Sequence, residues 1–220
     1  MTDSIDMKTL ARWAGALYLL IFVAAGFAEG GVRASVFVFG DAAATAAAIQ
    51  ADPGFFRLGI AADAVAFMAD AVVAVLLYFL LRPAGPVLAA VAAALRLVAH
   101  PAGAIINLAN QWSALAVLEN SGSPEQAYQL MQAHGFGYIL AGFAFGASLL
   151  VLGMLIHRAP TWPSWLAVLV AIAGAGYFID SFGMVLAPGN EALYTMIVTF
   201  SAVVGEFALT GWLLNKGFRK

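Results

Sequence analysis

The chain contains six apolar stretches, each long enough to cross a lipid bilayer as an α-helix. They cover about residues 13–31, 56–81, 87–117, 136–156, 165–186 and 192–214. A spanning helix needs roughly 20 mainly apolar residues. Of the 220 residues, 63% are hydrophobic and 10% are charged, whereas soluble domains average about 45–50% and about 25%. The sequence therefore predicts an all-α integral membrane bundle of six transmembrane helices, forming a single domain over residues 1–220.

The positions of the basic residues indicate how this bundle lies in the membrane. If six spans alternate, one side of the membrane receives Lys8, Arg12, Arg82, Arg158, Lys216, Arg219 and Lys220. The opposite loops carry acidic residues such as Asp41 and Glu119. Lys and Arg accumulate in cytoplasmic loops, so we expect both termini to be cytoplasmic.

Two of the outer connections have the signals of short helices. Residues 40–54 begin with Asp41 as a capping residue and end at Pro53 and Gly54, and residues 123–135 begin with Ser123 followed by Pro124. Asp and Ser are favoured caps, and Pro is favoured in the first turn. We expect two short interfacial helices on the outer side.

The second span carries two carboxylates in an otherwise apolar run, Asp63 and Asp70 in "FRLGIAADAVAFMAD". Seven residues are nearly two helical turns, so both side chains lie on one face. A charge at the bilayer centre costs about 2.5–3.5 kcal/mol even on a lenient scale, and such residues usually face the bundle interior. On the third span, a second polar stripe with spacings of three and four comprises Arg96, His100, Gly103, Asn107 and Asn110. We expect the two stripes to face each other.

Depth counting predicts which charges meet. At about 1.5 Å per residue, Asp70 lies roughly 18 Å from the cytoplasmic boundary, and Arg96 and Glu206 both lie roughly 15 Å from it. We therefore expect a buried charge centre of Asp70, Arg96 and Glu206, in which two carboxylates share one arginine. Such crowding raises the proton affinity of one carboxylate, which predicts a proton-binding site.

A second polar cluster is expected nearer the outer side. His100, Asp63 and Asp180 come to similar depths, and Pro101 should bend the third span beside them. The expected cavity or ligand-binding residues are Asp63, His100, Asn107, Asn110, Tyr177, Asp180, His134 and Tyr138. Its expected entrance consists of Glu29, Arg33 and Arg57.

Composition excludes several function classes. The net charge of −2 leaves no basic excess for nucleic acid. With no cysteine there is no disulfide and no thiolate chemistry. No phosphate-binding loop, serine elbow or intramembrane lysine is present. We expect no cofactor and no metal. The alternative is a metal held by His100, His134, Asp63 and Asp180.

The motifs "GDAAATAAAI", "FRLGIAADAVAFMAD", "LRLVAH", "HGFGYIL" and "GYFIDSF", in this order, resemble a bacterial multi-pass membrane family catalogued as domain of unknown function 4386. The resemblance covers most of residues 10–190. It implies a compact helical membrane bundle in the cytoplasmic (inner) membrane of a bacterium, and it brings no activity, cofactor or catalytic residue.

Three function classes remain open. The first is a protein for small-molecule or proton-coupled binding or transport, with an outward-facing polar cavity above the charge centre. The second is an intramembrane hydrolase, metal-dependent in one form, that acts on lipid. The third is a structural or sensory membrane subunit. The expected partners are membrane lipid and a small-molecule or lipid ligand, with no nucleic acid, and the oligomeric state is open.

Overall fold

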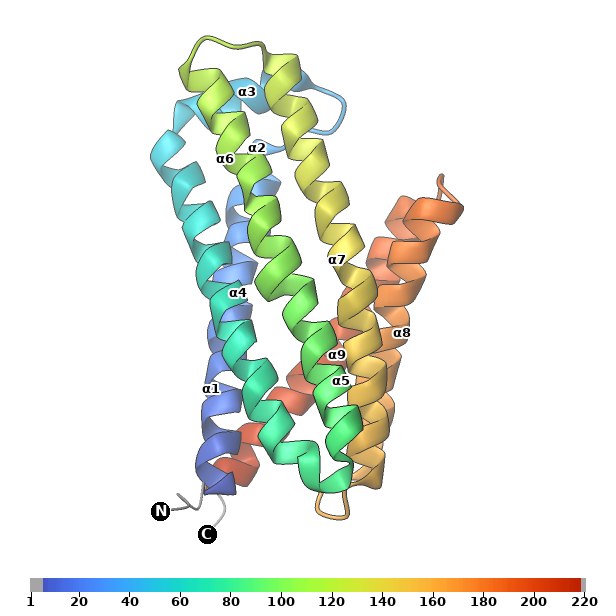
Figure 1. Ribbon diagram of the computed structural model, residues 1–220. Coiled ribbons are helices and arrows are strands. Elements are labelled where there is room, and N and C mark those ends of the chain that lie inside the picture. The colour runs from blue at the N-terminus through green and yellow to red at the C-terminus, as the bar shows by residue number, and fades with distance from the viewer. Residues whose placement is uncertain (1–5, 219–220) are drawn as a thin grey trace.

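The computed structural model describes residues 6–218, with side chains described as far as residue 215, and this part of the chain folds into helices without a strand. Figure 1 shows a long bundle. Its elements are α1 (Met7–Gly26), η1 (Phe27–Arg33), α2 (Ala34–Val36), α3 (Ala42–Ala51), α4 (Pro53–Leu81), η2 (Arg82–Ala84), α5 (Pro86–Leu97), η3 (Val98–Ala104), α6 (Ile105–Glu119), α7 (Pro124–Arg158), α8 (Ser164–Leu186) and α9 (Glu191–Phe218).

These elements build six candidate membrane spans among the described residues, in agreement with the prediction. They are Met7–Val36, Pro53–Ala84, Pro86–Glu119, Pro124–Arg158, Ser164–Leu186 and Glu191–Asn215. Large apolar side chains such as Met68, Val72 and Val75 remain exposed on the outside of α4, whereas Asp63 and Asp70 are buried on its other face. An apolar exterior around a charged interior is the arrangement that a surrounding bilayer favours.

The spans form a closed ring. Along the chain, α1 packs against α4, α4 against α5, α5 against α7, α7 against α8 and α8 against α9, and α9 returns to α1. Figure 1 shows that α1 begins and α9 ends at the same end of the bundle, where the α4–α5 and α7–α8 turns also lie. We call this the inner end and the opposite one the outer end.

The predicted helix starts are present. Asp41 accepts a hydrogen bond from the Ala44 amide at 2.8 Å, and the Ser123 hydroxyl accepts one from the Gln126 amide at 3.2 Å. At the start of α1, hydrogen bonding from Thr9 holds the pKa of the Asp6 carboxyl below its usual value. Each cap satisfies a backbone N–H that has no partner within its own helix.

Only one of the two expected short outer helices is a separate element. α3 lies across the outer end (Figure 1), but residues 124–135 are the first turns of the 35-residue helix α7. The segment before α3 contacts these turns. Tyr128 of α7 accepts a hydrogen bond from the Gly40 amide at 2.7 Å and stacks on Phe37. The second expected short helix is therefore not a separate element, because residues 124–135 continue without a break into the rest of α7.

Two spans contain a π-helical segment, η1 in the first and η3 in the third. η3 encloses Pro101, which has no amide hydrogen to continue an α-helical ladder. Its position agrees with the expected irregularity at this proline. π-Helical turns are frequent at functional sites, and here they carry Glu29, Arg33 and His100.

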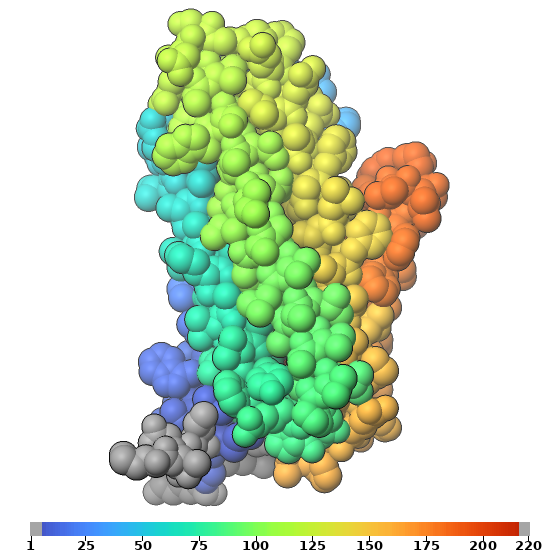
Figure 2. All heavy atoms as spheres, in the orientation of Figure 1, coloured from blue at the N-terminus to red at the C-terminus, as the bar shows by residue number. Residues whose placement is uncertain are grey.

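Apolar packing divides the bundle into two cores. The inner core includes residues of α1, α4, α5, α7, α8 and α9, such as Leu149, Leu166 and Leu209. The outer core is built around Ile49, Phe56 and Leu115, and none of its described members comes from α8 or α9. At the outer end the tips of α8 and α9 stand apart from α7 (Figures 1 and 2).

The crossing of α7 and α8 depends on Gly146 and Gly174. A Cβ on Gly174 would lie 2.8 Å from the Gly146 carbonyl oxygen and 2.9 Å from the Leu150 amide nitrogen. We predict that Gly174→Ala forces the helices apart and lowers the stability by about 1–3 kcal/mol. Thermal unfolding of the purified protein in detergent measures this loss.

Gly211→Ala is the matched control, because a Cβ at this α9 position meets nothing within 4 Å. Alanine favours helix more than glycine does, so this variant should unfold at the wild-type temperature or slightly above it. Equal destabilisation by the two substitutions would contradict the close crossing.

Candidate functional site

The inner half of the interior holds an ion pair between α5 and α4. Arg96 donates from Nε and Nη2 to Oδ1 of Asp70, at 2.8 and 2.5 Å. Both side chains are almost fully buried, with Arg96 and Asp70 each 2% exposed. α4 and α5 are joined by the short η2 turn and run antiparallel, which places the two residues at the same level. We call this pair the inner pair.

Aromatic rings flank the guanidinium of Arg96. Its Cζ lies 5.0 Å from the ring centroid of Tyr18 and 4.8 Å from that of Phe145. One nitrogen, Nη1, is buried without a hydrogen-bond partner in the protein. The ring faces supply electrostatic attraction on the sides where hydrogen bonds are absent.

Among the described residues, Glu206 makes no direct ion pair with Arg96. Its Oε1 accepts a hydrogen bond from the Tyr177 hydroxyl at 3.2 Å, and the ion pairs among the described residues join Arg96 to Asp70 and not to Glu206. The expected arrangement, in which one arginine contacts two carboxylates, is therefore not formed by direct contact. Equal depth brings α5 and α9 to one level, but Glu206 lies on α9 where Tyr177 of α8 reaches it.

A second ion pair lies toward the outer end. Arg33 of η1 bonds to Asp63 of α4, which is fully buried, and also to Glu29 one turn before it. The Arg33 Nε donates to Glu29 at 2.8 Å. We call Arg33 and Asp63 the outer pair. The two aspartates of α4 thus have separate arginine partners from two different helices.

A neutral polar cluster joins α6 to α7. The Asn107 amide nitrogen lies 3.2 Å from His134 Nδ1 and donates to the His134 carbonyl at 2.7 Å, while the Gln111 amide nitrogen lies 2.9 Å from His134 Nε2. Asn110 donates to Asn107 at 2.8 Å. Interhelical bonds of this kind fix the packing of membrane helices.

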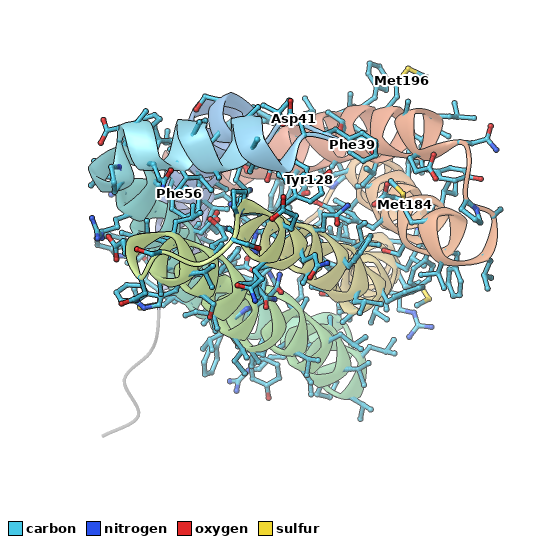
Figure 3. The ribbon with its side chains drawn as sticks, turned by 90° about the horizontal axis from the view of Figure 1, so that it is seen from above. Phe39, Asp41, Phe56, Tyr128, Met184 and Met196 are labelled. Atoms are coloured by element: carbon cyan, nitrogen blue, oxygen red, sulfur yellow. The ribbon has the colours of Figure 1, made fainter. Side chains whose placement is uncertain are left out.

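A cavity of about 600 Å³ lies in the outer half of the bundle, between η1, α7, α8 and α9. Its walls are mostly apolar and aromatic. Among the predicted site residues, its lining includes Glu29, Arg33, His100, His134, Tyr138, Tyr177 and Asp180. Phe39 and Met184 also line it and lie at its outer end, on the α3 side and the α8 side respectively (Figure 3).

His100 connects the cavity with the inner pair. It lines the cavity, and its Nδ1 lies 3.5 Å from Oδ2 of Asp70. The ring packs against Phe145, Tyr138 and Phe67 with centroids 4.3, 5.7 and 5.8 Å away. Tyr177 makes a parallel connection, because it lines the cavity and donates to Glu206.

Several predicted cavity residues lie elsewhere. Asp63 is held behind Arg33, and Asn107 and Asn110 belong to the neutral cluster. Arg57 pairs with Glu119 near the outer end of α4 and α6 instead of lining the entrance. The cavity therefore has fewer polar lining residues than predicted.

The alternative metal set is not brought together either. Residues 6–218 contain no group of three or more His, Asp or Glu side chains placed to hold a metal. Asp63 is bonded to Arg33, and His134 is bonded to amides. These partners occupy the groups that would have coordinated the ion.

Some site residues were missed although the sequence carries a signal for them. Gln111 lies four residues after Asn107, on the same helix face, and so continues the polar stripe of the third span. Tyr18 lies ten residues after Lys8, which is roughly 15 Å along the helix and the depth assigned to Arg96. Phe145 has no comparable signal, because the fourth span contains several aromatic residues.

Six apolar helices around a charged interior define a multi-pass membrane protein. The family described as "Domain of unknown function (DUF4386)" matches residues 13–217, and the chain belongs to this family. It is also similar to an uncharacterized protein of Archaeoglobus fulgidus, with 30% identity over 150 residues that cover 67% of this chain and 76% of the relative. No solved structure matches the chain.

The inner pair generates a prediction about stability. Arg96→Met leaves the Asp70 carboxylate buried without its cation, and losing one partner of a buried pair costs about 3–5 kcal/mol. We expect this loss in the unfolding free energy of the detergent-solubilised protein. The double variant Asp70→Asn with Arg96→Met should recover part of it, because no lone charge remains.

Arg57→Met is the control substitution, since Arg57 and Glu119 are 47% and 45% exposed in their side chains. Exposed pairs contribute at most about 1 kcal/mol. A loss of the same size in Arg57→Met and Arg96→Met would show that the inner pair has no special role.

Proposed function

We propose that this protein binds a small amphiphilic molecule in the outer cavity and that binding is linked to the charged interior below. The observation that carries the proposal is the cavity itself. Its volume of about 600 Å³ lies within the range of ligand pockets, about 300–1,000 Å³. Apolar walls with a few polar groups are also typical of such pockets.

Position in the bundle supports the proposal. Charged and polar groups inside a membrane span usually face the bundle interior, where they mark ligand and ion pathways. Glu29 and Arg33 lie on the π-helical segment η1 that borders the cavity, and Asp180 lies on α8, which also encloses it. A purely structural bundle gains nothing from leaving this volume open between them.

The connection through His100 supports a proton-linked form of this function. An occupant that contacts His100 changes the surroundings of a ring 3.5 Å from Asp70. A ligand at that ring is therefore one side chain away from the carboxylate of the inner pair. Transport coupled to protons is the extension of the proposal that this contact favours.

Charge placement supports an orientation for this function. The inner end carries Lys8, Arg12, Arg82 and Arg158 at helix ends or turns. With the inner end in the cytoplasm, the cavity lies in the outer half of a bacterial cytoplasmic membrane. Ligand then reaches the cavity from the outside or from the outer leaflet.

Photolabelling tests the proposal. A fatty alcohol that carries a diazirine should label the cavity-lining parts of α7 and α9, mapped by peptide mass spectrometry. Ala202 lines the cavity, so Ala202→Phe should fill it and reduce this labelling several-fold. Labelling that stays on lipid-facing surfaces and is unchanged in Ala202→Phe would refute a binding cavity.

Val203→Phe is the matched control. Val203 is the next residue along α9, is 50% exposed and is not part of the cavity wall. The same added ring there should leave the labelling of α7 and α9 inside the cavity at the wild-type level.

A further inference from the structure

Asp180 differs from the other charged groups of the interior because no described residue pairs with it. Asp63 and Asp70 each bind an arginine, and Glu206 accepts a bond from Tyr177. For Asp180 of α8, the described part of the chain provides neither an ion pair nor a side-chain hydrogen bond. The residue is half-buried and lines the cavity.

The position of Asp180 makes a free carboxylate unfavourable without a ligand. It lies six residues before the end of α8, roughly 9 Å inside the span. Carboxylates at such positions are expensive and usually find a partner. A cationic group bound in the cavity would be that partner.

The fixed charges around the cavity also favour a cation over an anion. Its wall carries Glu29, Asp180 and Arg33, and Arg33 is also bonded to Asp63 behind it. The wall and the layer behind it therefore hold three carboxylates and one guanidinium, and that guanidinium is bonded to Glu29 and Asp63. Among the described lining residues, no arginine or lysine is left free for an anionic ligand.

The remaining walls suit a cation that also has apolar surface. The aromatic side chains Phe37, Phe39, Phe136, Tyr138 and Tyr177 line the cavity. Aromatic faces attract cations within about 6 Å, and organic ammonium groups are bound in this way. The same rings bury the apolar parts of a ligand.

We infer that the outer cavity takes a lipophilic organic cation, with Asp180 as its counter-charge and the aromatic side chains as its walls. This inference rests on the proposed binding function and specifies the chemical class of the ligand. It commits to a monovalent cation with bulky apolar groups and excludes fatty acids and other lipophilic anions.

Two probe ions of nearly equal size and opposite charge test the inference. Tetraphenylphosphonium and tetraphenylborate are titrated into the purified full-length protein in the same detergent, by isothermal calorimetry. We expect tetraphenylphosphonium to bind and tetraphenylborate to bind at least about tenfold more weakly. Uptake by micelles is the same for every variant and cancels in the comparison between them.

Substitutions separate the charge from the cavity. Asp180→Asn should weaken tetraphenylphosphonium binding by about tenfold or more, and Asp180→Glu should retain most of it. Glu125→Gln is the control, because Glu125 is an exposed carboxylate in the first turn of α7 and lies outside the cavity. It should bind like the wild type.

The outcomes distinguish the inference from the function on which it rests. If both ions bind equally, and Ala202→Phe weakens both while Asp180→Asn weakens neither, the cavity binds ligands and the cation assignment is overturned. If Ala202→Phe changes the binding of neither ion, the proposed binding function itself is overturned.

Discussion

A carboxylate inside a membrane span needs a cation or a proton, and this constraint organises the bundle. α4 presents two aspartates on one stripe, and each is bonded to an arginine from a different helix. Asp63 ties α4 to η1, and Asp70 ties α4 to α5. The two contacts set the rotation of α4 against its neighbours, because turning it would expose a charge to hydrocarbon. The two apolar cores pack around this framework.

Much of the framework was predictable because it depends on length and spacing. Long apolar runs predict the six spans, and the short turn at residues 82–85 gives α4 and α5 a common origin for depth counting. That common origin is why the Asp70–Arg96 contact was predicted. Glu206 lies on the last span, which shares no turn with α4 or α5, and depth alone does not say to which side of a helix a residue points. Depth counting therefore gave the level of Glu206 in the bundle but not its partner, which is Tyr177.

Two of the other errors share a cause. Spacing rules assume a regular helix, whereas η1 and η3 are π-helical. Glu29 and Arg33 were both expected at the cavity entrance and are bonded to each other, but the same guanidinium also reaches Asp63 across the bundle. Asn107 and Asn110 were placed in the cavity because they follow His100 in the stripe. Beyond the π-helical turn at Pro101, Asn107 instead bonds to His134, and Asn110 bonds to Asn107.

The way α9 closes the ring has a consequence for how a solute would arrive. α1 and α9 touch in their inner halves, where Phe22 stacks on Phe207 at 4.3 Å and Leu214 lies close to Gly15. Farther out, η1 and α9 line opposite walls of the cavity. Because α1 continues into η1 and packs beside α9 in the ring, the side of the cavity between η1 and α9 lies on the perimeter of the bundle. For a ligand of the kind we propose, this side offers a lateral route from the bilayer, and the apparent affinity measured from water would then include the partition coefficient into lipid.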